Sequence, residues 1–292
     1  MPRSGCGPIL RAVSLFELRE PPDLVAPILV ASFDGWVDAG AAATTAAARL
    51  AEGAETIATF DTDSLYDYRA RRPTLEILDG RADRLTWPEL ALRRARIGGT
   101  DLLVLSGPEP DYRWREFEAD AVALARRLEV ATWISLGAIP AAVPHTRPVT
   151  ILGIESRPGL LRGGVAPGPE GVLRVPAAAI SVLDIAVGRA GIPTLGYFAQ
   201  VPHYVTGGYP PAAVELIRLV GLHLDTDIAT GELRDEARRM LALLDAATGG
   251  DPATKAHVER LEGMVDEARL PAGGDLITEI EQFLREQGGG RG

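Results

Sequence analysis

The chain has 292 residues, a formal net charge of −10 and a single cysteine, Cys6. An acidic surface repels phosphate backbones, so we expect no nucleic-acid partner, and one cysteine excludes an intrachain disulfide or a cysteine metal site. No apolar run reaches the roughly 20 residues of a membrane span, and the N-terminus lacks an apolar signal core, so we expect a cytoplasmic protein that is not in a membrane.

Strands and helices alternate through the first 225 residues. The apolar run APILVASF at 26–33 predicts a buried strand, residues 38–53 a helix capped by Asp38, and residues 55–61 a second strand. Further strands are expected at 100–107, 131–139, 149–156 and 192–201, with helices at 114–130, 176–191 and 210–224. This alternation predicts an α/β fold, a three-layer sandwich with a mostly parallel sheet.

The strand signal stops after residue 225. Apolar residues then recur at helical spacing in three segments, 231–248, 254–270 and 275–287, each with charged residues on the other face. We therefore expect an N-terminal tail at 1–22, the α/β domain at 23–225, a helical appendage at 226–286 and a disordered, glycine-rich tail at 287–292.

The familiar catalytic and cofactor motifs are missing. There is no phosphate-binding G-x-x-x-x-G-K-[ST] loop, no G-x-G-x-x-G fingerprint and no G-x-S-x-G nucleophile elbow. The four histidines have no metal-ligand spacing, and His223 and His257 are expected to be ordinary surface or packing residues. The sequence therefore predicts no catalytic residue, no metal and no cofactor.

Charged and aromatic side chains gather in the loops that follow the predicted strands. Because the carboxyl ends of parallel strands meet at one edge of a sheet, we expect these loops to come together there. The candidate ligand- or partner-binding residues are Asp34, Tyr66, Asp67, Arg72, Glu109, Arg113, His145, Thr146, Arg147 and His203.

Each candidate also has a purely structural interpretation. Asp34 and Asp38 are suitable caps for the first helix, and Glu109 and Arg113 are spaced for a salt bridge across a turn. His145, in the proline-rich AIPAAVPHTRPVT at 138–150, is suited to holding its own loop. Arg147 precedes Pro148, which restricts its backbone to extended geometry and aims the side chain, as either an anion-binding group or a structural clamp.

The same loops carry a family resemblance. FDGWVDAG, YDY, RRP, GPEPDYRW, LGAIPAAVPHTRP, GPEG and VPHY occur in this order and together resemble the proteasome assembly chaperone 2 family, in its actinobacterial branch. The similarity extends from about residue 25 to about residue 286 and includes EIEQFLRE near the C-terminus.

This resemblance implies a fold similar to the nucleoside phosphorylase/hydrolase-like α/β sandwich. It also implies self-association, with a trimer as the form considered, or pairing with a related subunit. For eukaryotic and some archaeal members it implies binding to proteasome α-subunits through a C-terminal hydrophobic–tyrosine–any motif. This sequence ends in QGGGRG and departs from that motif, so the resemblance does not carry the tail contact over.

Three hypotheses follow. The first, which we favour, is a non-enzymatic protein that resembles a proteasome assembly chaperone and acts through protein–protein contacts. The second is an enzyme or binder of a small anionic ligand, nucleoside- or phosphate-like, at the loops around His145 and Arg147. The third is a structural oligomer whose aromatic loops form the subunit interface. A concave pocket lined by His145, Arg147 and Glu109 would favour the second, and pairwise burial would favour the first.

Overall fold

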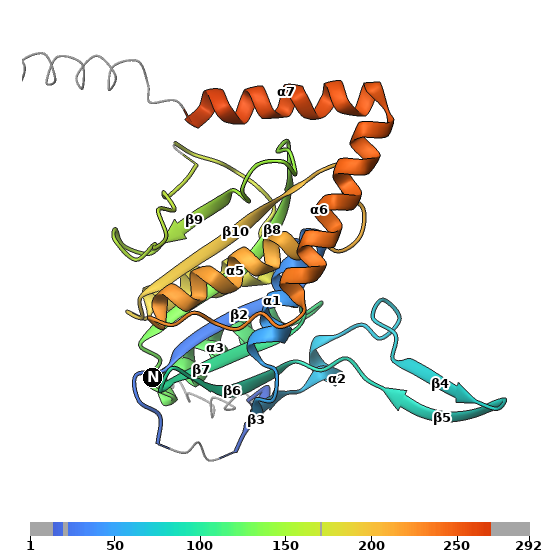
Figure 1. Cartoon of the computed structure of the whole chain (residues 1–292). Helices are drawn as coiled ribbons and strands as arrows, with labels where there is room; N and C mark the ends of the chain where they lie inside the picture. Colours follow the sequence, from blue (N-terminus) through green and yellow to red (C-terminus); the bar gives the residue numbers. More distant parts are fainter. Residues whose placement is uncertain (1–13, 20–22, 170, 270–292) are drawn as a thin grey trace, which may run out of the picture.

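An eight-stranded sheet lies at the centre of the molecule, which a computed structural model describes for residues 14–19, 23–169 and 171–269 (Figure 1). Its strand order is β1-β3-β6-β7-β2-β8-β10-β9. The strands are β1 (Phe16–Leu18), β2 (Ile28–Asp34), β3 (Glu55–Phe60), β6 (Ala91–Ile97), β7 (Thr100–Pro108), β8 (Thr132–Ala141), β9 (Ile151–Glu155) and β10 (Thr194–Pro202). Strand β1 lies in the range that the sequence assigned to an N-terminal tail.

The sheet is mixed rather than mostly parallel, which corrects the sequence-based expectation. Strands β7, β2, β8 and β10 pair in parallel, whereas β1–β3, β3–β6, β6–β7 and β10–β9 pair antiparallel. The change of direction arises at the turn between β6 and β7, where Gly98 and Gly99 both have positive φ. Two such residues form the tight turn of a hairpin, which needs no crossover helix.

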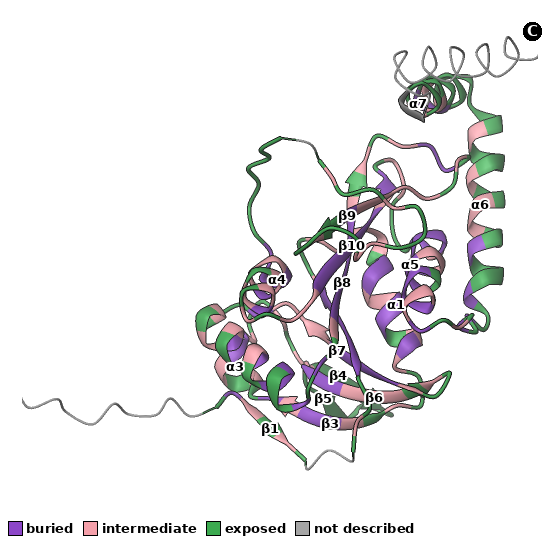
Figure 2. Cartoon of the chain, turned by 90° about the vertical axis from the view of Figure 1, so that its left-hand side faces the viewer, coloured by how far each residue is buried: buried purple, intermediate pink, exposed green. Residues whose placement is uncertain are grey.

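Helices cover both faces of the sheet, so the expected three layers are present (Figure 2). On one face lie α1 (Ala42–Leu50) and α5 (Pro210–His223), and on the other α3 (Trp114–Arg127) and α4 (Ala179–Arg189). Side chains alternate along β2: Val30 joins the core with α1 and α5, while Leu29 joins the core with α3 and α4. This period of two buries both faces of the strand, as its continuous apolar run predicted.

Helix α1 begins at Ala42, later than the sequence predicted, but Asp38 still bonds to its first turn. The Asp38 carboxylate accepts hydrogen bonds from the backbone N–H groups of Ala43 at 2.8 Å and Thr44 at 3.3 Å, across a short 3-10 turn at Ala39–Ala41. These bonds satisfy helix N–H groups that have no partner within the helix, so Asp38 is a cap.

A two-stranded hairpin extends from the body of the molecule (Figure 1). It follows the short helix α2 (Thr62–Leu65) and consists of β4 (Thr74–Leu78) and β5 (Arg81–Thr86), every residue of which is exposed. Asp79 and Gly80 form its turn, both with positive φ. These strands were not predicted from the sequence, because neither has the pattern of a buried strand.

Two helices follow α5. Helix α6 (Leu233–Gly250) packs against α5 and buries Leu233 and Ala237. Asp251 then accepts a hydrogen bond from the backbone N–H of Thr254 at 2.9 Å. The next helix, α7 (Pro252–Arg269), lies at a sharp angle to α6 (Figure 1). The third predicted helix and the predicted disordered tail lie outside the described residues. No helix in the described ranges has the length and apolar character to cross a membrane.

Candidate functional site

The structure places the predicted site residues in two groups rather than one. The first group lies at the ends of β2 and β7 and beside α2, and it contains Asp34, Tyr66, Asp67 and Glu109. The second lies in the loops after β8 and β10, and it contains His145, Thr146, Arg147 and His203. Within the described part of the chain, no hydrogen bond or ion pair links the two groups.

Arg71 holds the first group together. Its Nη1 lies 2.7 Å from Asp34 Oδ1, and its Nε lies 3.5 Å from Asp111 Oδ2. Asp34 also accepts the backbone N–H of Glu109 at 3.1 Å. Arg72, the candidate predicted from the sequence, is exposed, and the neighbouring Arg71 makes these contacts instead. Periodicity gave no basis for choosing between adjacent arginines in an irregular loop.

The other members of the first group bond within the chain. The Tyr66 hydroxyl donates to the Pro108 carbonyl at 2.8 Å, and burial raises the pKa of Tyr66. Glu109 Oε1 accepts the backbone N–H of Ala179 at 2.6 Å, where α4 begins. A carboxylate at a helix N-terminus is stabilised by the helix dipole, so Glu109 joins the end of β7 to α4.

The expected Glu109–Arg113 salt bridge does not form. Arg113 instead pairs with Glu116 one turn along α3, and this exposed pair raises the pKa of Arg113 and lowers that of Glu116. Asp67 contributes through its backbone N–H, which donates to Asp111 Oδ2 at 2.9 Å.

Arg147 joins the loop after β8 to helix α7. Its Nε and Nη2 donate to the two carboxylate oxygens of Asp266 at 2.9 and 2.8 Å, and its Nη1 donates to Glu262 at 3.1 Å. The Thr146 hydroxyl also donates to Glu262. The bond to Asp266 holds the pKa of Arg147 above its ordinary value. A planar guanidinium suits this two-pronged contact, so the aimed arginine binds carboxylates of its own chain.

His145 is the buried centre of the same loop. Its backbone N–H donates to the Tyr204 hydroxyl at 2.8 Å, and its Nδ1 lies 2.8 Å from the same oxygen. Its Nε2 lies 3.3 Å from Asp245 Oδ1 on α6, within ion-pair range but without hydrogen-bond alignment. Beside it, the ring of His203 lies 5.4 Å from that of His257 on α7. The loop therefore contacts both C-terminal helices.

The space around this loop is filled. The hollow lined by Pro144, Arg147, Tyr209 and Val265 has a volume of about 10 Å³. That volume is at the lower limit for a single water molecule and far below what a nucleoside needs.

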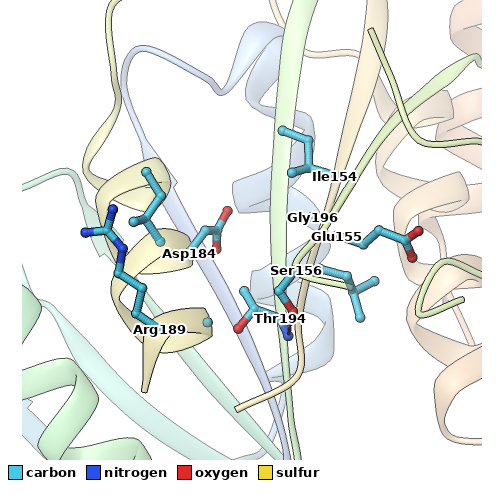
Figure 3. A pocket seen from close by; sticks show the side chains of 10 residues that line it. Ile154, Glu155, Ser156, Asp184, Arg189, Thr194 and Gly196 are labelled. Atoms are coloured by element: carbon cyan, nitrogen blue, oxygen red, sulfur yellow. Dashed lines mark hydrogen bonds between the residues drawn. The ribbon is translucent and has the colours of Figure 1, made fainter. Parts of the chain in front are cut away.

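Asp184, which was not among the residues predicted from the sequence, lies on α4 beside an open pocket of about 360 Å³ (Figure 3). The residue is half-buried, because its side chain faces this pocket, yet the surrounding protein excludes enough water to raise the pKa of Asp184 to about 7. Ser135 donates a hydrogen bond to the Asp184 carboxylate, and Trp133 Nε1 donates to Ser135 Oγ at 3.0 Å. A lone acid in the apolar segment AISVLDIAV was the signal that the sequence offered.

In the described ranges, no group of three or more histidine, cysteine, aspartate or glutamate residues is arranged to hold a metal ion.

Comparison with known proteins gives one family. A model of the PAC2 family matches residues 32–248. A solved structure from Corynebacterium glutamicum, of unknown function, is 30% identical with a TM-score of 0.80, covering 87% of this chain and 98% of that one. No curated protein matches.

Two other solved structures carry more informative descriptions. A proteasome-assembly chaperone homologue of Mycobacterium tuberculosis is 33% identical with a TM-score of 0.72, covering 79% of this chain and 99% of its own. A PAC2 family protein of Streptomyces avermitilis is 35% identical with a TM-score of 0.71, covering 80% and 99%.

Proposed function

The chain belongs to the PAC2 family, and we propose that it is a non-enzymatic factor that binds proteasome α-subunits and assists their assembly. The observation that carries this proposal is the 33% identity to a proteasome-assembly chaperone homologue, over 79% of this chain. The proposal places the protein in the cytoplasm, and self-association, with three copies as the expected number, is part of it.

The contacts of the candidate residues support a role in protein binding. Asp34, Glu109 and Arg147 are engaged by groups of the same chain, and the hollow beside Arg147, about 10 Å³ in volume, is too small for a nucleoside or a phosphate. Such contacts fix the positions of loops and helices, and they engage the Arg147 guanidinium with carboxylates of the same chain. The alternative of a nucleoside- or phosphate-like ligand at this loop is therefore not favoured.

The hairpin β4–β5 gives independent support. Leu75, Ile77, Leu78 and Leu85 are between 47% and 66% exposed, and Trp87 beside them is 51% exposed. An isolated two-stranded hairpin is marginally stable in water, and contiguous exposed apolar side chains are typical of interaction surfaces. The hairpin is thus a surface that a protein partner would cover.

Native mass spectrometry of the purified protein, alone and mixed with actinobacterial proteasome α-subunits, tests the proposal. We expect a homo-oligomer in the first sample and a defined complex with α-subunits in the second. A homo-oligomer that never binds α-subunits would overturn the proteasome role.

A triple variant, Leu75→Ser, Ile77→Ser and Leu85→Ser, tests the hairpin. These side chains contribute little to the folded core, so the variant should fold and should lose either the homo-oligomer or the α-subunit complex. The control is Leu243→Ser on α6, a side chain that is 68% exposed and lies far from the hairpin in the chain. Unchanged complexes in the triple variant would exclude the hairpin as the contact surface.

A further inference from the structure

The carboxylate of Asp184 has no cationic partner in the described part of the chain, whereas Asp34 pairs with Arg71, and Glu262 and Asp266 pair with Arg147. Its hydrogen bond comes from the neutral hydroxyl of Ser135, which in turn accepts from the Trp133 indole. Both Ser135 and Trp133 are fully buried. A carboxylate enclosed by protein without a counter-charge is costly, and such groups concentrate at functional sites.

The pocket that Asp184 faces is formed by α4 on one side and by β9 and the start of β10 on the other (Figure 3). Its volume of about 360 Å³ is within the range of small-molecule sites. Gly196 on β10 helps to keep it open, because a Cβ at this position would lie 2.7 Å from the Phe198 ring. A side chain at position 196 would therefore require the Phe198 ring to shift.

The walls of the pocket are largely apolar. Ile154 on β9 and Ile185 on α4 are 46% and 56% exposed, although both are large aliphatic side chains. The pocket therefore has an apolar rim, formed by the two exposed isoleucines, around the single carboxylate of Asp184.

The other polar groups of the pocket are already engaged or directed elsewhere. Glu155 accepts the backbone N–H groups of Leu160 and Leu161 at 2.8 and 3.1 Å, and Ser156 Oγ accepts the N–H of Thr194 at 3.0 Å. Figure 3 shows the Arg189 side chain directed away from Asp184. Asp184 is thus the group that remains to meet a ligand.

We propose that this pocket binds a primary ammonium group on an apolar stem, with the ammonium on Asp184 and the stem between Ile154 and Ile185. An ammonium supplies the charge that the carboxylate lacks, and it is a compact donor that fits a single acidic group. The negative charge of Asp184 would repel an anion. A divalent metal would need further ligands, which the described part of the chain does not provide here.

Isothermal titration calorimetry with hexylamine, and with hexanol as the neutral counterpart, tests this proposal on the full chain. We expect hexylamine to bind at least tenfold more tightly than hexanol at pH 8. Hexylamine stays protonated from pH 5 to 8, so its affinity should fall about 100-fold when the pH is lowered from 8 to 5, because Asp184 then becomes protonated. At pH 7, binding should release about half a proton, which titrations in two buffers of different ionisation enthalpy would detect.

Two variants locate the effect. Asp184→Asn keeps an oxygen for Ser135 and should bind hexylamine no better than hexanol, with no dependence on pH. Glu155→Gln removes a carboxylate from the same pocket and should leave the ratio between hexylamine and hexanol unchanged. Equal affinity for both probes, absence of hexylamine binding at millimolar concentration, or retained hexylamine binding in Asp184→Asn would each overturn the proposal.

The same ammonium chemistry occurs in free amines and in lysine side chains. A parallel titration with Nα-acetyl-lysine amide separates the two sources. Tighter binding of the lysine derivative would identify a partner's lysine as the occupant, whereas tighter binding of hexylamine would identify a small amine. Both results support the site, and both are independent of whether α-subunits bind the hairpin.

Discussion

The 138–150 loop and the Asp184 pocket are opposites in sequence and in structure. The loop is rich in charge and proline, and its Arg147 is fully engaged by Asp266 and Glu262. The pocket is lined by the apolar helix α4, whose one acidic residue, Asp184, has no cationic partner among the described residues. The comparison teaches that a dense charged motif often supplies its own partners. A solitary buried charge is the better sign of an unmet interaction.

The largest expected effect concerns the cost of keeping Asp184 ionised. Because the pKa of Asp184 is raised from 3.8 to about 7, the folded chain binds more protons than the unfolded chain between these values. Its contribution to stability is therefore present at low pH and is lost as pH rises through 7. Relative to the wild type, Asp184→Asn should gain on the order of 2 kcal/mol between pH 5 and pH 8, measured by urea unfolding.

The control for this measurement is Asp83→Asn, an exposed carboxyl on the hairpin, which should follow the wild type at both pH values. If Asp184→Asn also follows the wild type, Asp184 is not a strained group and the contrast with the loop disappears.

The next effect tests whether the loop depends on its internal partners. Tyr204→Phe removes the hydroxyl that accepts the His145 N–H and contacts its ring. Leaving these buried groups without a partner should cost about 1–2 kcal/mol of unfolding free energy. Tyr112→Phe, at a half-exposed tyrosine, should cost nothing measurable. Equal values for the two variants would show that the loop is held by packing alone.

A smaller effect separates two adjacent arginines. Arg71→Ala leaves Asp34 and Asp111 without their cation and should cost about 1 kcal/mol, because these side chains are partly exposed. Arg72→Ala should leave the unfolding free energy unchanged within about 0.5 kcal/mol. Chemical denaturation of both variants measures the two unfolding free energies. A larger loss of unfolding free energy in Arg72→Ala would contradict our assignment of Arg71 as the partner of Asp34 and Asp111.

The smallest effect on global stability is expected for Arg147→Ala. The contact is near the surface and joins α7 to the domain, so we expect an almost unchanged melting temperature. Backbone hydrogen exchange in α7 should become several-fold faster. Arg147→Lys keeps the positive charge but loses the planar guanidinium that contacts both oxygens of Asp266, so hydrogen exchange in α7 should occur at an intermediate rate. Unchanged exchange in both variants would mean that Arg147 is not the clamp of α7.

The sequence predicted where the candidate residues lie better than which groups they contact. It placed Asp34 and Glu109 at strand ends and Arg147 in the loop after a strand, and the structure has them there. It did not predict that Glu109 would cap α4 or that Arg147 would bind α7, since those partners are 70 and 119 residues away along the chain. Such contacts depend on how the helices are arranged on the sheet.

By itself, the sequence determined the layers of this protein. The period of two along β2, the alanines of α1 and the cap at Asp38 are local signals. Burial of apolar surface then requires helices to pack on both faces of the sheet. Only the tertiary structure decided that the sheet is mixed, that Arg71 rather than Arg72 joins Asp34, and that Asp184 faces a pocket without a cation. These features depend on distances between distant segments, and a carboxylate is paired or unpaired only once the chain has folded around it.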